Sequence, residues 1–340
     1  MSDQLTSNSR PRVLSGMRPT GRLHLGNYMG ALANWVKLQD SGLYECYFFI
    51  ADVHALTTDY ADTSNIAPNV REVAYDFLAA GLDPKRSTIF IQSHVKQHFE
   101  LPMYLGMISP LSWLERVPSY KEMQENLEHK DLTTYGFLGY PVLMASDILL
   151  YQPKYVPVGQ DQQAHVELTR ELARRFNHYY QLDGRDVLPE PDVLLTPSPK
   201  LPGTDGRKMS KSYGNTILIS DPEPEVRKKL KTMVTDPARV RRTDPGDPDK
   251  CPVGDLHKVF STPETLAKVY DGCRSAGIGC IECKGWAADA LVQLLNPIQE
   301  RRASLREDEV EAILKEGADR AAARAEQTMV EVRSAMKMPA

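Results

Sequence analysis

The sequence predicts an α/β protein in which a doubly wound parallel sheet is followed by a C-terminal domain made only of helices. Through the first two hundred residues, short apolar runs rich in β-branched and aromatic residues alternate with amphipathic helical patterns. Strands separated by helices are typical of parallel βαβ units. From Pro222 onward helical patterns dominate and the β-branched runs disappear. The length of 340 residues allows about two domains of roughly 100–200 residues each.

Five apolar runs are expected to form the strands of the sheet. They cover residues 12–15, 44–51, 88–92, 155–158 and 193–196. Amphipathic helices are expected between them, for example at residues 27–38 and 163–176, because each of these segments carries its apolar side chains on one stripe. In a sheet of this class ligands bind in the crevice beyond the carboxyl ends of the strands.

The helical domain is expected to contain four amphipathic segments. They cover residues 225–234, 263–270, 286–303 and 307–336. The connector at residues 244–251, DPGDPDKC, is rich in turn-forming residues and indicates a break between helices. The last segment is rich in Ala, Glu and Arg, so we interpret it as a long closing helix with a solvated charged face.

Composition excludes several classes of protein. The chain has 41% hydrophobic residues, 21 glycines and 24 prolines, which fits neither a collagenous nor a disordered chain. Its 41 Lys and Arg against 45 Asp and Glu give a formal net charge of −4. A mildly acidic chain is not attracted to phosphate as a whole, so nucleic-acid binding requires a local basic patch.

The N-terminus offers no apolar core for a signal peptide. No later stretch approaches the roughly 18 uncharged apolar residues that span a bilayer. We therefore expect a cytoplasmic protein with no membrane contact. Disulfides are disfavoured there, so closely spaced cysteines favour a metal or cluster site over bridges.

The segment after the first strand, residues 16–27, reads GMRPTGRLHLGN. It contains glycines and leads into a helix, and the free N–H groups of a helix start let a phosphate or a flat base approach the backbone. His24 and Asn27 can both donate to a phosphate oxygen, while Gly26 leaves room for adenine. A turn with a surface histidine is the alternative interpretation of this segment alone.

A second segment, residues 203–215, reads GTDGRKMSKSYGN. Its lysines, Lys208 and Lys211, flank a Met-Ser pair in a loop with glycines on both sides. Such a loop can swing and place two compact ammonium groups against a polyphosphate. By itself the segment is also compatible with a solvated basic loop.

The two segments together resemble a known family. His24-Leu25-Gly26-Asn27 resembles the HIGH signature of class I aminoacyl-tRNA synthetases, and residues 208–212, KMSKS, match the second signature of that class. The segments RPTGRLHLGNYMGAL, ADVHALT, GYPVLMASDILLY and VPVGQDQQAHVELTRELARRFN resemble the bacterial type of tryptophanyl-tRNA synthetase, and the resemblance covers nearly the whole chain from Arg12. It departs from that pattern at Leu14 and Arg18, where many relatives carry an aromatic residue and a glutamine.

The resemblance implies a reaction in which the substrate carboxylate attacks the α-phosphate of ATP, pyrophosphate leaves, and the aminoacyl group passes to the 3′ end of tRNA. The protein must then supply positioning and charge stabilisation. The catalytic residues implied are His24, Asn27, Lys208, Lys211 and Lys121, the last of which is alternatively a solvated helix charge. The ATP contacts implied are Arg18, Thr20, Gly26, Asn27, Gly159, Asp161, Lys208, Met209, Ser210, Lys211 and Ser212. Mg²⁺ is expected on the triphosphate without a dedicated protein cage.

A predicted helix around residue 144 favours tryptophan over tyrosine. It places Tyr140, Met144 and Asp147 on one face at i, i+4 and i+7. Asp147 can accept a hydrogen bond from an indole N–H, and Met144 supplies a polarizable apolar wall. The resemblance adds further contacts to the tryptophan site, at Gly16, His54 and Gln162. The discrimination against tyrosine is weaker than that against phenylalanine, because a phenol hydroxyl also donates.

Four of the five cysteines fall within one segment, at Cys251, Cys273, Cys280 and Cys283. The last two have the short C-x₂-C spacing with which neighbouring residues bind one centre. The pattern resembles a [4Fe–4S] motif found in a subset of tryptophanyl-tRNA synthetases, and a Cys₄ Zn²⁺ site is the alternative. Cys46, flanked by aromatic residues in a predicted strand, is expected to be a buried core residue.

A local basic patch is present at residues 226–243, with seven Lys or Arg and one acid. It is either a solvated helix face or a contact for tRNA phosphates.

The resemblance implies a domain organisation as well. It consists of a flexible N-terminus (1–11), a Rossmann-like catalytic domain (12–219) with a helical dimer-interface insertion (about 95–145), a helical anticodon-binding domain with the cysteines (220–310) and a C-terminal helix (311–340).

The predicted function is therefore a homodimeric tryptophan–tRNA ligase, which uses L-tryptophan, ATP and tRNA(Trp). The alternatives are a tyrosine–tRNA ligase, or a cluster- or zinc-bearing RNA-binding regulator on the same fold.

Overall fold

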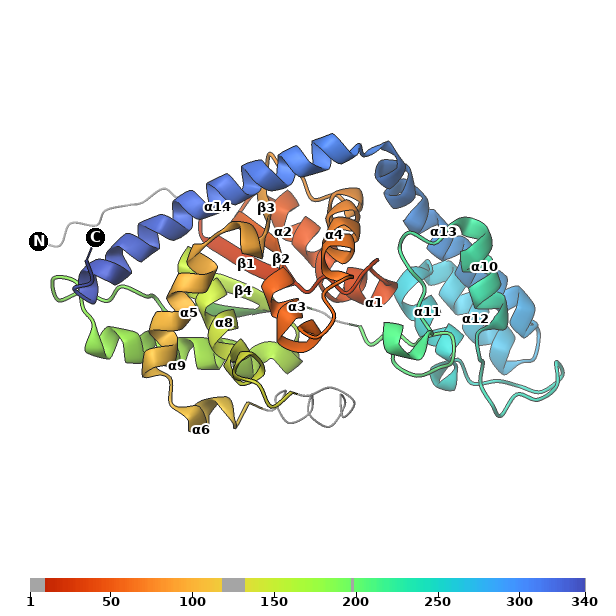
Figure 1. Cartoon of the computed structure of the whole chain (residues 1–340). Helices are drawn as coiled ribbons and strands as arrows, with labels where there is room; N and C mark the ends of the chain where they lie inside the picture. The colour runs from red at the N-terminus through yellow and green to blue at the C-terminus, as the bar shows by residue number, and fades with distance from the viewer. Residues whose placement is uncertain (1–9, 118–131, 197–198, 340) are drawn as a thin grey trace, which may run out of the picture.

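Five strands form a parallel sheet in the order β3-β2-β1-β4-β5 (Figure 1). The strands are β1 (Arg12–Met17), β2 (Glu45–Ile50), β3 (Ser87–Ile91), β4 (Tyr155–Val158) and β5 (Asp192–Leu195). Each overlaps a predicted run, and the predicted parallel α/β class is confirmed. The computed structural model describes residues 10–117, 132–196 and 199–339.

The strand order reverses at β1. The chain adds β2 and β3 on one side of β1 and then crosses back to add β4 and β5 on the other side. Such a reversal opens a crevice at the carboxyl ends of the two strands that diverge, which is where ligands bind in doubly wound sheets. The carboxyl ends of β1 and β4 therefore mark the expected binding site.

Helices cover both faces of the sheet. The helices between the strands are α1 (Leu25–Asn27), continued by the π-helical turn η1 (Tyr28–Leu32) and α2 (Ala33–Ser41), then α3 (Asp52–Asp59), α4 (Ile66–Ala80), α5 (Gln97–Ile108), α6 (Leu111–Leu114), α8 (Tyr135–Tyr151) and α9 (Gln163–Tyr179). Two short 3₁₀ turns, η2 (Gln92–His94) and η3 (Gln160–Gln162), follow β3 and β4, and a third, η4 (Lys211–Tyr213), lies within the second motif segment.

The alternation of side chains along the strands divides the core into two clusters. On one face Trp35 of α2 stacks on Phe48 at 4.9 Å between ring centroids and meets Phe77 of α4 edge-on. On the other face Phe49 and Phe90 stack on each other and pack with α5, α8 and α9. Cys46 is buried in the first cluster, as predicted.

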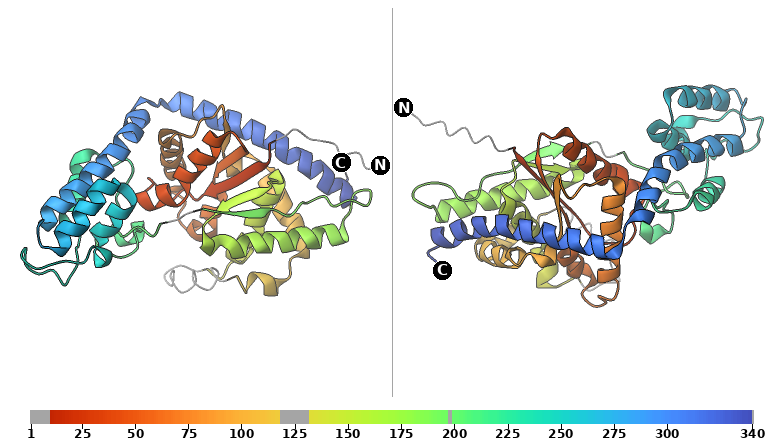
Figure 2. Two further views of the ribbon diagram at one scale, coloured as in Figure 1. Left: turned by 180° about the vertical axis from the view of Figure 1, so that it is seen from behind. Right: turned by 90° about the horizontal axis from the view of Figure 1, so that it is seen from above.

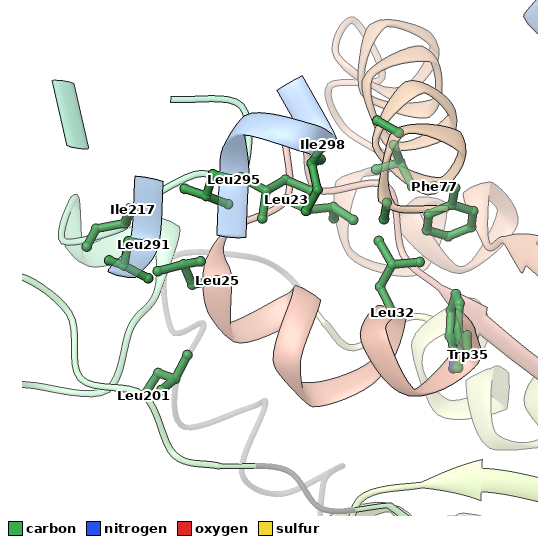
Figure 3. Packing of buried hydrophobic residues seen from close by; sticks show 14 of the residues in the cluster. Leu23, Leu25, Leu32, Trp35, Phe77, Leu201, Ile217, Leu291, Leu295 and Ile298 are labelled. Atoms are coloured by element: carbon green, nitrogen blue, oxygen red, sulfur yellow. The ribbon is translucent and has the colours of Figure 1, made fainter. Parts of the chain in front are cut away.

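The C-terminal helices form a separate group that remains attached to the first cluster. They are α10 (Glu223–Thr232), α11 (Pro252–Phe260), α12 (Pro263–Arg274) and α13 (Cys280–Ser304), with the turn η5 (Pro248–Lys250) before α11. Leu291, Leu295 and Ile298 of α13 belong to the same buried cluster as Leu23 and Leu25 (Figure 3). The helical region is thus packed directly against the segment that follows β1.

The last helix, α14 (Glu307–Ala335), leaves this group and runs back along the sheet (Figure 2). It crosses the edge strand β3 so closely that Gly317 leaves no room for a Cβ atom against the backbone of Ile89. Arg320 donates to the carbonyls of Pro84 and Ser87 at the same edge. The helix therefore covers a strand edge that would otherwise be exposed. In the part of the chain that is described, no helix is both long and apolar enough to cross a membrane.

Candidate active site

A cavity of about 530 Å³ lies at the carboxyl ends of β1 and β4, where the strand order reverses. This volume is in the usual range for small-molecule sites. β1 and the turn after it contribute Gly16 and Arg18, and β4 and its turn contribute Gly159. Further lining residues come from the start of the helical run (Gly26 and Asn27), from α3 (His54), from α8 (Tyr140, Met144 and Asp147) and from the region after β4 (Gln162 and His165).

The first motif segment is fixed by its own side chains. His24 is the N-cap of α1, and its Nδ1 accepts hydrogen bonds from the backbone of Gly26 at 3.0 Å and of Asn27 at 3.3 Å. In return the Asn27 Oδ1 accepts from the His24 N–H at 3.2 Å. Burial, and then the charges of Lys211 and Lys208, lower the pKa of His24 to about 4. The ring is therefore neutral at pH 7 with its proton on Nε2, and both Nε2–H and the Asn27 amide group remain as donors.

Backbone hydrogen bonds join the first motif segment to the residues that directly follow the second. Leu23 accepts from the Ile219 N–H at 2.9 Å, and the Leu25 N–H donates to Ile217 at 2.9 Å, so His24 faces Leu218 in an isolated antiparallel bridge. From the second segment, Lys211 reaches back and donates from Nζ to the Thr20 carbonyl at 2.8 Å. Two segments nearly two hundred residues apart therefore meet next to Gly26 and Asn27, which line the cavity.

The second motif loop is anchored by two buried side chains. Met209 is 4% exposed and packs into the core, while Asn215 is 2% exposed. Asn215 accepts from the Ser210 N–H at 2.8 Å and donates to Asp205 at 2.7 Å and to the Lys208 carbonyl at 3.1 Å. The sequence analysis predicted a loop that can swing, but it did not predict these anchors. The two lysines therefore project from a loop whose backbone is fixed by Met209 and Asn215.

Lys211 is half-buried beside the first segment. Burial lowers its pKa to about 8, although the carboxylate of Asp76 opposes that shift. Near pH 7 it is therefore still largely protonated, and its charge is lost as the pH rises through about 8.

The opposite end of the cavity is built around Asp147 of α8, whose side chain is 2% exposed. Its Oδ1 accepts from His98 Nδ1 at 2.6 Å and from Gln92 Nε2 at 2.8 Å. Its Oδ2 accepts from His54 Nε2 at 2.8 Å and from Gln92 Nε2 at 2.9 Å. Burial opposes ionisation, but the two imidazoles outweigh it and hold the pKa of the carboxyl below its ordinary value. Asp147 is thus a buried, ionised acceptor.

Comparison with known proteins agrees with this geometry. A sequence profile described as "tRNA synthetases class I (W and Y)" matches residues 6–296. The chain is 52% identical over 330 residues to the tryptophan–tRNA ligase of Thermotoga maritima, covering 96% of this chain and 99% of the relative. It is 47% identical over 393 residues to that of Ralstonia nicotianae, covering 96% and 98%. The chain belongs to the class I tRNA synthetases of the tryptophan and tyrosine group.

Solved structures of synthetases resemble this fold across its length. Tryptophanyl-tRNA synthetase from Campylobacter jejuni, in a crystal structure complexed with ADP and tryptophan, is 32% identical with a TM-score of 0.85, covering 96% of this chain and all of that one. Tyrosyl-tRNA synthetase from Archaeoglobus fulgidus has a TM-score of 0.65 at 24% identity. The second likeness shows that the two branches share the fold.

Four of the eleven predicted ATP contacts of this synthetase line the cavity, and most of the others lie on the two motif segments. Arg18, Gly26, Asn27 and Gly159 line the cavity itself. Thr20 faces Lys211, and Ser210 and Ser212 lie 2.9 Å apart through their hydroxyls. Met209 is different, because its side chain is buried in the core and leaves only its backbone to face a ligand. Lys121 and the Asp161 side chain lie outside what the structure describes.

The predicted tryptophan contacts of the synthetase also lie together. Gly16, His54, Tyr140, Met144, Asp147 and Gln162 all line the cavity. A Cβ atom on Gly16 would collide with the ring of Phe49, so this position requires glycine at the present ring placement.

Three contacts of this end were not anticipated from the sequence. They are Gln92, His98 and Tyr151, whose hydroxyl lies 2.8 Å from His98 Nε2. The sequence did contain a signal for them, because Gln92 directly follows an apolar strand and His98 and Tyr151 are polar residues within apolar helices.

The four cysteines line a second, smaller cavity in the helical region, together with Arg239 and Asp236. Cys280 and Cys283 lie in the first turn of α13, and Cys251 immediately precedes α11. Arg239 Nη1 approaches the Cys273 sulfur at 3.7 Å, and His257 Nε2 lies 3.4 Å from that of Cys283. Among the described residues, no group of three or more His, Cys, Asp or Glu side chains is arranged to hold a metal ion.

Proposed function

We propose that the synthetase is a tryptophan–tRNA ligase. It activates L-tryptophan with ATP to give tryptophanyl-adenylate and pyrophosphate, and then transfers tryptophan to the 3′ end of tRNA(Trp). The observation that carries this assignment is a single cavity lined both by the buried acceptor Asp147 and by Gly26 and Asn27 of the first motif. Such a cavity can take an indole and a phosphate group together.

The residues of the phosphate end suit an attack by the substrate carboxylate on the α-phosphate. The nucleophile belongs to the substrate, so the enzyme's task is to position both groups and to stabilise the charge that develops on the phosphate oxygens. His24 and Asn27 donate neutral hydrogen bonds, while Lys208 and Lys211 supply positive charge. Mg²⁺ on the triphosphate and a contact from Lys121 remain predictions.

The residues around Asp147 define how the indole is recognised. An indole N–H is a donor only, so it needs an acceptor, and an ionised carboxylate is acceptor-only. His54, with a side chain 12% exposed, is the more accessible of the two histidines on Asp147, since His98 is fully buried. We expect tryptophan to enter by replacing the His54 hydrogen bond at Oδ2.

ATP–pyrophosphate exchange with tryptophan and with tyrosine in parallel tests the assignment. Exchange with tryptophan and none with tyrosine is expected. Exchange with tyrosine alone would make the enzyme a tyrosine–tRNA ligase, and exchange with neither would favour an RNA-binding regulator on this fold.

We propose in addition that the helical region binds tRNA. The basic segment at residues 226–243 includes exposed cations such as Lys228, Lys231 and Arg241 on and after α10. Phosphate contacts by such residues weaken as salt increases. A tRNA affinity that does not change with salt would contradict this role. The domain boundaries and the cytoplasmic location also remain predictions.

The cysteine cavity is proposed to hold a [4Fe–4S] cluster, with Zn²⁺ as the alternative. Four thiols lining one cavity match the donor set of both groups. Burial, and then the neighbouring thiols, raise the pKa of Cys283 to about 12, so four thiolates coexist here only beside a cationic centre. When bound, the centre would link α11, α12 and α13 by metal–sulfur bonds.

Anaerobic purification followed by metal and sulfide analysis distinguishes these groups. A brown protein with iron and sulfide is expected, and Cys283→Ser should lose both. Stoichiometric zinc in a colourless protein would establish the alternative.

An exposed apolar surface on α5 and the start of α8 is proposed to bind a second copy of the chain. Phe99, Met103 and Met107 follow each other at i, i+4 and i+8, with Met107 75% exposed, and Tyr135 of α8 is 74% exposed. Contiguous apolar surface of this kind marks interaction sites. We expect Met107→Asp to convert a dimer to a monomer in sedimentation, whereas the control Leu43→Asp, exposed at the far end of α2, does not.

A further inference from the structure

One face of α4 connects the two motif segments to the helical region. It carries Asn69, Glu72 and Asp76, spaced at i, i+3 and i+7, which are neighbours on a helix surface. A Cβ atom on Gly21, which has φ +92°, would lie 3.2 Å from Asn69 Oδ1 and 3.7 Å from Lys211 Nζ. The α4 face is therefore in contact with the first motif segment and close to the lysine of the second.

Asp76 is the buried end of this face, with no exposed surface. Its Oδ2 accepts from the Leu23 N–H at 2.7 Å, and its Oδ1 accepts from Arg302 Nη1 at 2.6 Å. Leu23 directly precedes His24, and its carbonyl is already engaged by Ile219. The Asp76 carboxylate thus holds one side of the segment whose other side is held by residues after the second motif.

Arg302 belongs to the last turn of α13 and fixes that helix to α4. Its Nη2 donates to Glu72 Oε2 at 2.6 Å, its guanidinium lies over the Tyr75 ring at 5.3 Å, and the adjacent Arg301 donates to the Ala79 carbonyl at 2.6 Å. The first turn of α13 carries two of the four cysteines. At 1.5 Å per residue, this 25-residue helix extends roughly 37 Å between the two ends.

We propose that Asp76 is a positioning residue for adenylate formation, which sets the first motif segment through the Leu23 amide and joins it to α13 through Arg302. This inference rests on the proposed function, because it concerns the ATP half-reaction. Asp76 touches neither substrate in this geometry. Its effect is exerted through the placement of His24 and through the charge next to Lys211.

Because Asp76 is charged, its positioning role should be visible in how ATP activation depends on pH. Asp76 is faced by Arg302 from α13, by Glu72 from its own helix and by Lys211 from the second motif, and Lys211 is faced in turn by His24. The Asp76 carboxylate favours the protonated form of Lys211. Removing that charge lowers the pH at which Lys211 is neutralised.

Asp76→Asn is the informative variant, since it keeps the size of the side chain and an oxygen that can accept from Leu23. We expect kcat/KM for ATP in the exchange reaction to fall about 100-fold, which is a usual cost of misplacing reacting groups. The enzyme concentration in this assay is the concentration of active sites, measured from a pyrophosphate burst. The alkaline limb of its pH profile should move to lower pH. The dissociation constant of tryptophan without ATP should stay unchanged.

Arg302→Lys provides a second variant in case Asp76→Asn does not fold. It retains a cation beside Asp76 but lacks the rigid guanidinium that donates to Asp76 and Glu72 from two separate nitrogens. Its kcat/KM for ATP should fall while the alkaline limb stays in place. Arg71→Gln, which breaks an exposed pair between α4 and Glu307, is the matched control and should behave as the unaltered enzyme.

Several results would overturn the inference. Unchanged ATP kinetics in both variants would leave Asp76 with a packing role only, as would an equal loss of tryptophan affinity. If the unaltered enzyme exchanges no pyrophosphate with tryptophan, the proposed function fails and this inference fails with it.

Discussion

The two ends of the cavity are constructed differently. At the tryptophan end, Asp147 lies within the long helix α8 and receives hydrogen bonds from three side chains, with almost no exposure. At the phosphate end, Lys208 is exposed in the loop before η4, and Lys211 is half-buried at the start of η4. The specificity group is buried among three donors, whereas the charged groups lie at the ends of long side chains on an anchored turn.

This difference follows from the chemistry at each end. Recognition of one N–H group requires an acceptor whose position and ionisation do not depend on the ligand. An amino acid that displaces the His54 hydrogen bond without supplying a donor leaves the buried carboxylate short of one partner, and this rejects it. Phosphoryl chemistry moves negative charge between oxygens, so its donors must follow that charge. The sequence places the first group in a helix and the second group in a glycine-bounded loop.

The largest change is expected at the rigid end. Asp147→Ala removes the acceptor of the indole and leaves His54, His98 and Gln92 without their partner. We expect kcat/KM for tryptophan to fall about 1,000-fold or more, with the KM for ATP nearly unchanged, in steady-state exchange assays. Asp319→Ala on the exposed side of α14 is a matched control. Unchanged tryptophan kinetics would remove Asp147 from the indole site.

An intermediate effect is expected at the phosphate end, as a dependence on pH. Lys211 acts in its protonated form, and its pKa is lowered to about 8. Activity toward ATP should therefore be lost as the pH rises through that value, falling about tenfold per unit above it. Lys211→Arg should move this limb to higher pH, because a guanidinium stays charged. If the Lys211→Arg enzyme loses activity at the same alkaline pH as the unaltered enzyme, a group other than Lys211 causes that loss.

The smallest effect separates two roles of His24. His24→Asn retains an oxygen that can cap α1 but loses the Nε2–H donor, whereas His24→Ala loses both. Urea unfolding should show a loss of about 1 kcal/mol for Ala and little for Asn. Exchange kinetics should fall about tenfold for both variants, since one hydrogen bond to a charged oxygen is worth about 1.5 kcal/mol. Full activity of His24→Asn would limit the residue to capping.

Much of this organisation was predictable from the sequence, because local patterns encode it. The five strands follow from short β-rich runs, and the shared face of Tyr140, Met144 and Asp147 follows from helical spacing. The meeting of the two motifs was expected from the family resemblance, and the bridge between His24 and Leu218 gives it a structural basis.

The missing parts depend on contacts between distant segments. Gln92 and His98 reach Asp147 from η2 and α5, and Asp76 reaches Leu23 and Arg302 across 53 and 226 residues. A buried carboxylate within the apolar run of α4 is visible in the sequence, but its partners are not. The start of α13 at Cys280 was also missed, because the predicted helix began at residue 286.

Calorimetric titration of tryptophan, without ATP, into Lys211→Met and Asp147→Ala enzymes tests the division between the two ends most directly. Lys211→Met should bind tryptophan with the affinity of the unaltered enzyme, while Asp147→Ala should bind it too weakly to measure under the same conditions. Equal losses in both variants would contradict the account, because they would show that the two ends do not act separately.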